Sequence, residues 1–375
     1  MLLTNLANND NIAIRSHFAW IKCDKYQRSK SGGLFVKSNL KKLSFLLFGL
    51  VLMLAACGGN GSSSTDSKGN ETNNASESGT ADDKTYKIGI TQIVEHPSLN
   101  AATEGFKKAI EESGLKVEYD PQIAQGDNSL NTTIANNLVS ANVDLIFANS
   151  TPSAQAAATA TGDIPIIFTS VTDAVGAQLI DSMEKPGKNV TGTIDLHPDT
   201  ISKTVAFLKD LGAKKVGMVY NAGEQNSVAQ VKEVKKVMSE QGLTVVEASA
   251  ATSAEVKQAA ESLIGKADAF YIITDNTVVS ALESVIDVAN ANKLPLVVGE
   301  LDSVARGGLG AYGFEYFDIG YEAGQMAVKI LKGEAKPADI PAQYPQKLKL
   351  LINKKVADDL GIDIKDSWGA ELLEK

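Results

Sequence analysis

The sequence predicts an α/β protein with two similar doubly wound parallel-sheet lobes, joined by a hinge that the chain crosses several times. Three observations carry this prediction. From residue 85 onward, short apolar runs of strand type alternate with runs of helical spacing, as in a parallel sheet covered by helices on both faces. The alternation then starts again with a similar sequence, and extended segments connect the two halves.

The first half reads as a complete series of strands and helices. Short β-type runs predict its strands, at 87–91 (KIGIT), 115–119 (LKVEY), 143–148 (VDLIFA) and 164–169 (IPIIFT). Apolar residues at helical spacing predict helices over 102–112, which Gly114 ends, and over 130–140. A further helix is expected between the third and fourth strands.

The second half repeats this series at a nearly constant offset. Four of its segments resemble segments of the first half: KVGMV (215–219), VKKVMSEQGLTVVEA (234–248), ADAFYIITD (267–275) and KLPLVVGELD (293–302). Gly114 and Gly242 lie 128 positions apart, and Pro165 and Pro295 lie 130 positions apart. We therefore expect two lobes of the same topology.

Extended crossings are expected to join the two lobes. The junction at 190–198 (VTGTIDLHP) suits a hinge, and a strand at 310–314 with a helix over 319–331 has no counterpart in the first half. A last strand is expected at 348–352. The expected division gives each lobe two parts: 85–194 with 310–335 in lobe one, and 195–309 with 336–375 in lobe two. Such lobes can close on each other by hinge motion.

The sequence predicts that the first 84 residues are a targeting segment followed by a tether. The apolar run 43–53 follows two lysines and is short for a membrane span, so it suits a signal peptide. It ends in LAAC-G at Cys57, which resembles a bacterial lipobox with a lipidated cysteine. We expect a leader over 1–56, with a mis-assigned start over 1–39, and a disordered tether over 57–84. The expected location is the outer face of a cell membrane of Gram-positive type, held by lipid alone.

Charge is distributed unevenly along the chain. The formal net charge of −9 combines +6 in residues 1–56 with −15 in the remainder. The acidic body argues against non-specific binding to nucleic acid. Only one of the three arginines, Arg306, lies beyond residue 56, so a ligand anion has to be held mostly by other groups. No cysteine follows Cys57, which excludes disulfides from the body.

Polar side chains follow the predicted strands at their carboxyl ends, where ligands bind in open parallel sheets. In the first half, Ser150 and Thr151 with Pro152 read as a helix start, whose free N–H groups attract an anion. Thr169 and Ser170 add hydroxyl donors after the next strand. We expect a ligand carboxylate here, and capping without a ligand is the alternative for each residue.

In the second half the corresponding loops supply acceptors. Asp275, Asn276 and Glu224 are candidates to accept hydrogen bonds from an ammonium group, and capping is again the alternative. A helix start in one lobe opposite carboxylates in the other suits a zwitterion such as an amino acid. Other candidates for ligand contact are His96, Pro97, Tyr220, Asn226, Ser227, Glu300 and Phe314. Candidate walls for an apolar side chain, with core packing as the alternative, are Tyr220, Phe314, Phe168, Tyr271 and Tyr316.

Motifs of enzymes and of DNA-binding proteins are missing from the sequence. It has neither a G-x-S-x-G elbow nor a P-loop, and its three histidines do not make a metal cluster. GLGAYG at 308–313 fits G-x-G-x-x-G, but it lies before and within a strand rather than between a strand and a helix. A transcriptional repressor whose effector domain shares this fold would need a DNA-binding helical domain in front of it. The acidic body and the lipobox contradict that alternative. We expect a binding protein with no catalytic residues, no cofactor and no metal.

The loops and strands together resemble the substrate-binding lipoproteins of ABC uptake systems, which have the type I periplasmic-binding-protein fold, and among them the tryptophan/aromatic amino-acid family. The resemblance is carried by KIGITQIVEHPSLNAATEGFKKAI (87–110), ANSTPSAQA (148–156), FTSVTDAVGA (168–177), VYNAGEQNSVAQV (219–231), TDNTVVSAL (274–282) and YGFEYFDIGYEAG (312–324). It implies a ligand in the cleft, hinge closure, and delivery to an ABC permease with a separate ATPase subunit. The implied ligand is an aromatic amino acid. A sugar or nucleoside is the alternative, weakened because Trp368, near the tail, is the only tryptophan outside the leader.

Overall fold

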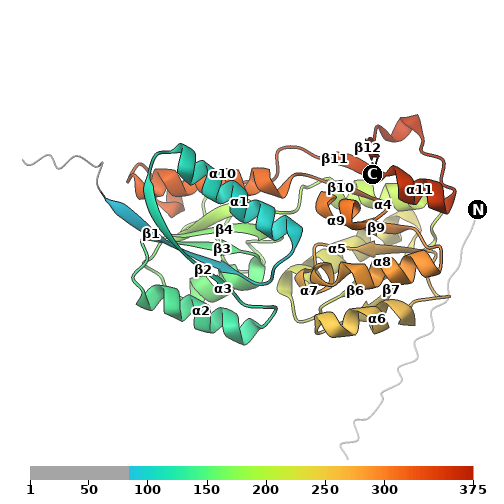
Figure 1. Cartoon of the computed structure of the whole chain (residues 1–375), viewed down its shortest axis with the longest axis horizontal. Helices are drawn as coiled ribbons and strands as arrows, with labels where there is room; N and C mark the ends of the chain where they lie inside the picture. Colours follow the sequence, from blue (N-terminus) through green and yellow to red (C-terminus); the bar gives the residue numbers. More distant parts are fainter. Residues whose placement is uncertain (1–83, 375) are drawn as a thin grey trace, which may run out of the picture. The chain divides into compact units, whose positions relative to one another are not determined.

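The computed structural model describes residues 84–374, so the expected leader, the lipidation site at Cys57 and nearly all of the tether lie outside the described residues. The first sheet has five parallel strands in the order β2-β1-β3-β4-β5 (Figure 1). These strands are β1 (Thr85–Gln92), β2 (Lys116–Ile123), β3 (Leu145–Asn149), β4 (Ile166–Val171) and β5 (Val190–Ile194). The helices between them are α1 (Pro97–Glu112), α2 (Asn128–Ser140) and α3 (Thr151–Ala160).

Helices cover both faces of this sheet, because its central strands are apolar on both sides. On one face, Phe106 of α1 stacks on Phe147 of β3 with ring centroids 3.9 Å apart. On the other face, Leu138 of α2 and Ala157 of α3 pack in one cluster with Ile146 of β3. This packing confirms the predicted helix-covered parallel sheet in the first lobe.

The second sheet has seven strands in the order β12-β11-β10-β9-β8-β6-β7, and the β10–β11 pair is antiparallel. The strands are β6 (Lys215–Tyr220), β7 (Thr244–Ser249), β8 (Ala269–Ile272), β9 (Leu296–Val298), β10 (Gly310–Gly313), β11 (Lys349–Asn353) and β12 (Glu371–Leu373). The helices of this half and of the tail are α4 (Thr200–Asp210), α5 (Gln225–Gln241), α6 (Val256–Ser262), α7 (Asn276–Ser280), α8 (Leu282–Ala291), α9 (Leu301–Arg306), α10 (Tyr316–Leu331) and α11 (Lys354–Leu360).

The sheet topology confirms the internal repeat. The order β2-β1-β3-β4-β5 of the first sheet recurs as β7-β6-β8-β9-β10 in the second. β10 and α10 therefore correspond to β5 and α4, so the expectation that this strand and helix have no counterpart is wrong. The sequence does not reveal this correspondence, because the segment VTGTI of β5 has little apolar character and suits a hinge. In the structure all five of its residues are buried.

In each half, the helix that follows the fifth strand of the repeat packs in the other lobe. α10 follows β10 of the second sheet yet packs along α1, and α4 follows β5 of the first sheet yet packs against α5 (Figure 1). The expected division therefore changes at two places. Gly310–Gly313 lies in the second sheet because it pairs with β9 and β11, and Ile340 and Ala342 lie in the core of the first lobe. The chain crosses after β5, after β10, and between Gln343 and Lys349.

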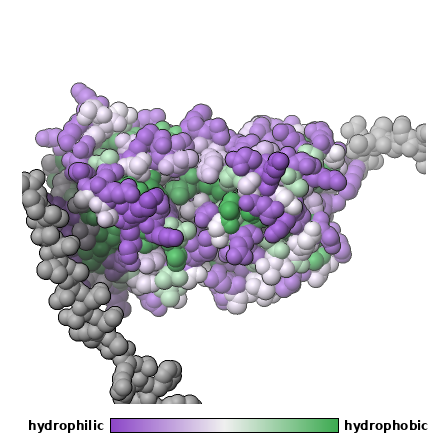
Figure 2. All heavy atoms as spheres, turned by 180° about the vertical axis from the view of Figure 1, so that it is seen from behind, coloured by the Kyte–Doolittle hydropathy of each residue, from purple (hydrophilic) through white to green (hydrophobic). Residues whose placement is uncertain are grey.

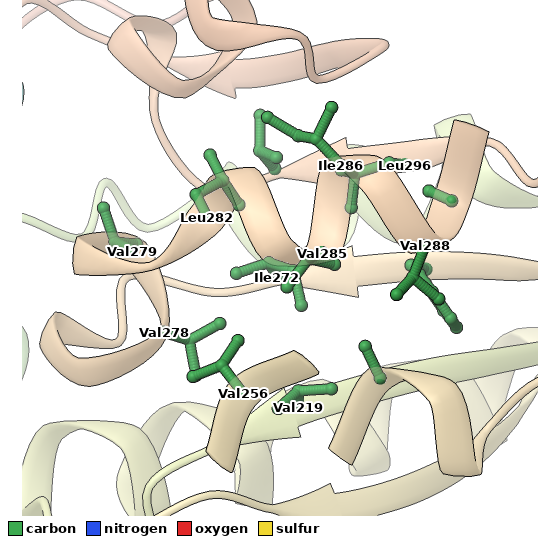
Figure 3. Close-up of a cluster of buried hydrophobic side chains, with 14 of the residues drawn as sticks. Val219, Val256, Ile272, Val278, Val279, Leu282, Val285, Ile286, Val288 and Leu296 are labelled. Atoms are coloured by element: carbon green, nitrogen blue, oxygen red, sulfur yellow. The ribbon is translucent and has the colours of Figure 1, made fainter. Parts of the chain in front are cut away.

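Apolar packing in the second lobe holds α7, which begins beside the carboxyl ends of the strands. Figure 3 shows Val278 of α7 and Leu282 and Val285 of α8 in the cluster that also contains Ile272 of β8. Burial of one such side chain contributes roughly 1.5–3 kcal/mol. α7 has five residues, too few for a helix that is stable by itself, so this core determines where its N-terminus lies.

Two glycines let α1 and α10 approach closely. A Cβ atom on Gly320 would lie 1.9 Å from the carbonyl oxygen of Ala102, and one on Gly105 would lie 2.1 Å from the carbonyl oxygen of Phe317. We expect Gly320→Ala to lower the free energy of unfolding by about 1–3 kcal/mol, because the helices have to separate. Urea unfolding measures the effect. Gly162→Ala, whose Cβ would meet no atom within 4 Å, is the matched control, and equal stability of the two variants would contradict this reason.

Candidate functional site

The carboxyl ends of the two sheets face each other across the boundary between the lobes. A cavity of about 870 Å³ is lined by residues 172–175, which follow β4, and by residues 222–225, which follow β6. A second cavity of about 420 Å³ is lined by residues 93–94, which follow β1, and by residues 276–277 at the start of α7. The polar loops predicted in both halves are therefore brought together, as in other open parallel sheets that bind ligands.

The larger cavity has an apolar rim that reaches the surface. Val175, Val228 and Tyr344 line it and are 45%, 47% and 43% exposed, which is unusual for side chains of this size. In Figure 2, apolar residues come to the surface near the middle of a mostly hydrophilic face. No helix within residues 84–374 combines the length and the apolar character that a membrane span needs.

Asp275, at the N-cap of α7, is fully buried, and both of its carboxylate oxygens accept hydrogen bonds from groups of the protein. One oxygen accepts hydrogen bonds from the Asn221 N–H and the Ser227 hydroxyl, both at 2.6 Å. The other accepts from the Val278 N–H at 2.8 Å. These contacts are those of a capping residue. They favour the capping alternative over direct contact with a ligand for both Asp275 and Ser227.

Glu224 lies beside Asp275 and is only 4% exposed. Its oxygens accept hydrogen bonds from the backbone N–H and the side chain of both Asn276 and Thr277, over distances of 2.6–3.2 Å. The Asn226 side chain also donates to it at 3.3 Å. Glu224 and Asp275 thus form a buried acidic pair at the start of α7, and most of their acceptor positions are filled from within the second lobe.

Two further carboxylates are buried at the same boundary. Asp195, just after β5, accepts hydrogen bonds from the Thr172 hydroxyl at 2.9 Å and the Tyr316 hydroxyl at 3.0 Å. Glu300, after β9, accepts from the Ser303 hydroxyl at 2.7 Å. The charge of Glu300 adds to the effect of burial in raising the pKa of Asp195.

The four carboxylates have no ion-pair partner within residues 84–374. Burial and the charge of Glu224 raise the pKa of Asp275 to about 7, and burial raises the pKa of Asp195 to about 6. Burial also raises the pKa of Glu300. The guanidinium of Arg306 pairs with Glu283 through two 2.8 Å hydrogen bonds, and its charge partly opposes the rise in the pKa of Glu300. A cationic group bound at this boundary would favour the ionised forms of the carboxyl groups whose pKa values are raised.

His96 occupies the N-cap position of α1 without capping it, and it is 7% exposed. Burial, reinforced by the charge of Arg306, lowers its pKa to about 3, whereas Asp302 and Glu224 act in the opposite direction. All three of these charged residues belong to the second lobe. The imidazole is therefore neutral at pH 7, with one donor and one acceptor nitrogen, at the contact between the lobes.

Several buried polar atoms at this boundary have no hydrogen-bond partner within residues 84–374. On the first lobe they are Oγ1 of Thr91, Nδ1 of His96, Oγ1 of Thr151 and Oγ of Ser170, and on the second lobe they are Oε1 of Gln225, Oδ1 of Asn226 and Nε2 of Gln230. Buried polar groups in proteins are normally hydrogen-bonded, so such a gathering indicates a place for a ligand or for water.

Two serines at this boundary have unusual backbone conformations. Ser150, after β3, has φ 104°, and Ser170, after the neighbouring strand β4, has φ 56°. Both values lie in the region that residues other than glycine rarely adopt, and such strain gathers at functional sites. Ser150 stands at the N-cap of the ten-residue helix α3 without a side-chain cap bond, so the helix start that the sequence predicts as an anion site is not closed by its own serine.

The remaining candidates from the sequence are engaged elsewhere. Thr169 shares a 2.8 Å hydrogen bond with Thr193, and Ser150 donates to Ser153 at 3.3 Å. Tyr220 is half-buried and donates to Glu247 on the neighbouring strand. Pro97 is exposed, and Phe314 stacks on Tyr316. Phe168 and Tyr271 are fully buried in the lobe cores, where the Tyr271 hydroxyl also lacks a partner within residues 84–374.

Asp195 is a site residue that sequence reasoning missed. It follows β5 and precedes the crossing, and the interpretation of 190–198 as a hinge removed it from the set of strand ends. β5 and β10 hold equivalent places in the two sheets, so Asp195 after β5 is equivalent to Phe314 after β10, which is a candidate from the sequence. An alignment of these two segments would therefore point to Asp195. Within the described residues, no group of three histidine, cysteine or acidic side chains is arranged to hold a metal ion.

Two α/β lobes of one topology, three crossings between them and facing polar strand ends define a solute-binding protein of the type I periplasmic-binding fold. Residues 87–372 match the family described as ABC transporter substrate binding protein. The chain belongs to this family. As the substrate-binding component of an ABC transporter, it acts outside the cytoplasm.

Relatives of known name support this assignment. The chain is 42% identical over 327 residues to a tyrosine-binding protein of Clostridioides difficile strain R20291, with 85% of this chain and 91% of the relative covered. It is 35% identical to a domain from Streptococcus pneumoniae whose structure was solved in complex with L-Trp, with a TM-score of 0.73 and coverage of 77% and 99%. A ligand-free, open structure of a substrate-binding protein with adhesive properties from Clostridium difficile is 42% identical, with a TM-score of 0.59 and the same coverage.

Proposed function

We propose that this protein captures an aromatic amino acid between its lobes and delivers it to the permease of an ABC importer. The observation that carries the proposal is the gathering of unpartnered buried polar atoms on both lobes, at the boundary where four carboxylates lack a cation. One relative is named for tyrosine and another was solved with L-Trp, and both facts support an aromatic ligand.

The charges at the boundary suit a zwitterion. Thr151 Oγ1, Ser170 Oγ and the start of α3 offer donors to a ligand carboxylate from the first lobe. In the second lobe, Glu224 and Asp275 form a buried acidic pair, and an ammonium group beside it would favour the ionised form of Asp275. A neutral sugar or nucleoside would leave these buried carboxylates without a counter-ion, so the site favours an amino acid over that alternative.

Closure of the lobes is the expected result of binding. A ligand that contacts both lobes favours the closed state by its extra contacts there. This chain has a higher TM-score with the L-Trp complex than with the ligand-free open structure, although it is less identical to the former. The comparison supports an arrangement of the lobes closer to the liganded relative.

Transport without catalysis and a lipid anchor complete the proposal. The solute-binding role of the family supports binding without catalysis. Lipidation at Cys57 would keep the protein at the outer membrane surface, and residues 57–84 would let it reach the permease. Mass spectrometry of the mature protein tests the anchor, since a mature N-terminus other than Cys57 contradicts it.

We expect L-tyrosine or L-tryptophan to stabilise residues 85–375 against heat, by about 2.7 kcal/mol at a free concentration of one hundred times Kd. Aliphatic amino acids are expected to stabilise less, because they bury less apolar surface in the cleft. Thermal unfolding against all amino acids and a set of sugars and nucleosides measures this. Stabilisation by sugars or nucleosides alone would overturn the ligand class, and turnover of a bound compound would overturn the transport role.

A further inference from the structure

We infer that the side-chain oxygen of Asn226 is the group that accepts a hydrogen bond from the ligand ammonium, and that it selects ligands with a donor on the α-carbon. The inference rests on the proposed function and adds to it the atom that recognises the amino group. It follows from three features of the second lobe: the orientation of this amide, the occupancy of the neighbouring carboxylates, and their charge.

The orientation of the Asn226 amide is determined by its surroundings. The residue lies in the first turn of α5 and is 2% exposed. Its amide nitrogen lies within hydrogen-bond distance of Glu224 Oε2 and Ser227 Oγ, both at 3.3 Å, and of the Thr274 carbonyl oxygen at 3.4 Å. All three are acceptors for that nitrogen, so the NH₂ group faces them and Oδ1 takes the other position. Oδ1 has no partner within residues 84–374.

The neighbouring carboxylates are poorer candidates for direct contact. Asp275 is fully buried, and both of its oxygens already accept hydrogen bonds from the protein. Glu224 accepts five, from Asn226, Asn276 and Thr277. Asn226 therefore contacts the acidic pair through its NH₂ group and keeps the lone pairs of its amide oxygen free, whereas the two carboxylates have their acceptor positions filled.

This combination fits an ammonium group better than any neutral donor. A buried acceptor without a partner destabilises the protein, and a ligand N–H that bonds to it removes this cost. The acidic pair stabilises a positive charge at the same place. Gln225 Oε1 is also buried without a partner within residues 84–374, but no carboxylate of the acidic pair contacts the Gln225 side chain, so Gln225→Ala serves as a comparison in the test below.

A ligand series on the wild-type protein tests the inference without any mutation. Calorimetry compares L-tyrosine, its α-hydroxy analogue 3-(4-hydroxyphenyl)lactate and its desamino analogue 3-(4-hydroxyphenyl)propanoate, or the matching indole compounds if L-tryptophan binds more tightly. We expect the amino acid to bind about 100-fold more tightly than the desamino analogue. The hydroxy analogue should fall between them, because its hydroxyl can donate to Asn226 Oδ1. Equal affinity of the hydroxy and desamino analogues would overturn the inference, since a purely ionic site gains nothing from the hydroxyl.

Substitution of Asn226 assigns the effect to this residue. We expect Asn226→Ala to weaken binding of the amino acid about tenfold or more and binding of the desamino analogue less than about threefold. Asn290→Ala, at an exposed asparagine of α8 in the same lobe, is the matched control and should change neither. Equal losses for both ligands, or a selective loss in Gln225→Ala instead, would overturn the inference. If Asn226→Ala does not fold, the wild-type series decides.

The failure of the inference and the failure of the proposed function give different results. If the wild-type protein binds no aromatic amino acid, the proposed function fails and the inference falls with it. If it binds one with a strong preference for the amino group that Asn226→Ala leaves unchanged, only the assignment to Asn226 fails.

Discussion

Replacement of Asp275 with alanine is expected to lower the free energy of unfolding by about 3–5 kcal/mol, because three buried or partly buried donors lose their acceptor together. These donors are the Asn221 N–H, the Ser227 hydroxyl and the Val278 N–H. The N-cap of α7 is removed by the same change, which loosens the element that carries Asn276 into the site. Urea unfolding followed by circular dichroism measures the loss.

The isosteric variant Asp275→Asn is the control for this prediction. Its single oxygen can still accept from one or two of the donors, so we expect less than half the loss seen in the alanine variant. Direct contact of Asp275 with the ligand, the alternative to capping, instead predicts that Asp275→Ala weakens ligand binding with little effect on the fold. An alanine variant with wild-type stability and strongly reduced affinity would restore that interpretation and remove the capping role.

The fold was predictable from the sequence where local pattern and tertiary placement agree. Strands such as β1, β3, β6 and β8 are short apolar runs between helical segments, and the repeat reveals their common order. β5 was not recognised, because its buried state comes from α10 and from residues 340–343, which lie far away in the sequence. Likewise, α4 and α10 each pack in the lobe opposite to the strand that precedes them, and this placement cannot be predicted from the local spacing of apolar residues.

The sequence predicts which loops form the candidate site, but it does not predict which polar atoms in these loops remain free to bind a ligand. The end of a parallel strand is a local feature, so the sequence predicts the loops that the structure brings to the boundary between the lobes. Whether a polar atom in such a loop is free depends on partners distant in the sequence. Asp275 is occupied by Asn221 and Ser227, which precede it by 54 and 48 positions. Thr169 is occupied by Thr193, whereas Thr151 and Ser170 remain free.

Acidification is expected to destabilise the wild-type protein relative to the His96→Asn variant. The pKa of His96 is about 6.5 in the unfolded chain and about 3 in the folded protein, where burial disfavours the charged ring. Between these two values the unfolded state binds more protons, so the stability contributed by neutral His96 is complete above pH 6.5 and is lost as pH falls. Each pH unit within this window removes up to about 1.4 kcal/mol.

The difference between the two proteins isolates this effect. Asp275 and Asp195 have raised pKa values, so their contributions run the other way, with stability lost as pH rises from about 4 toward 6 or 7. They are present in both proteins and largely cancel. We therefore expect the free energy of unfolding of the wild type, relative to His96→Asn, to fall by about 2 kcal/mol between pH 7 and pH 5 in urea titrations. A difference that does not change with pH would mean that His96 is solvated in the folded protein, and that the lobes do not enclose it as the structure shows.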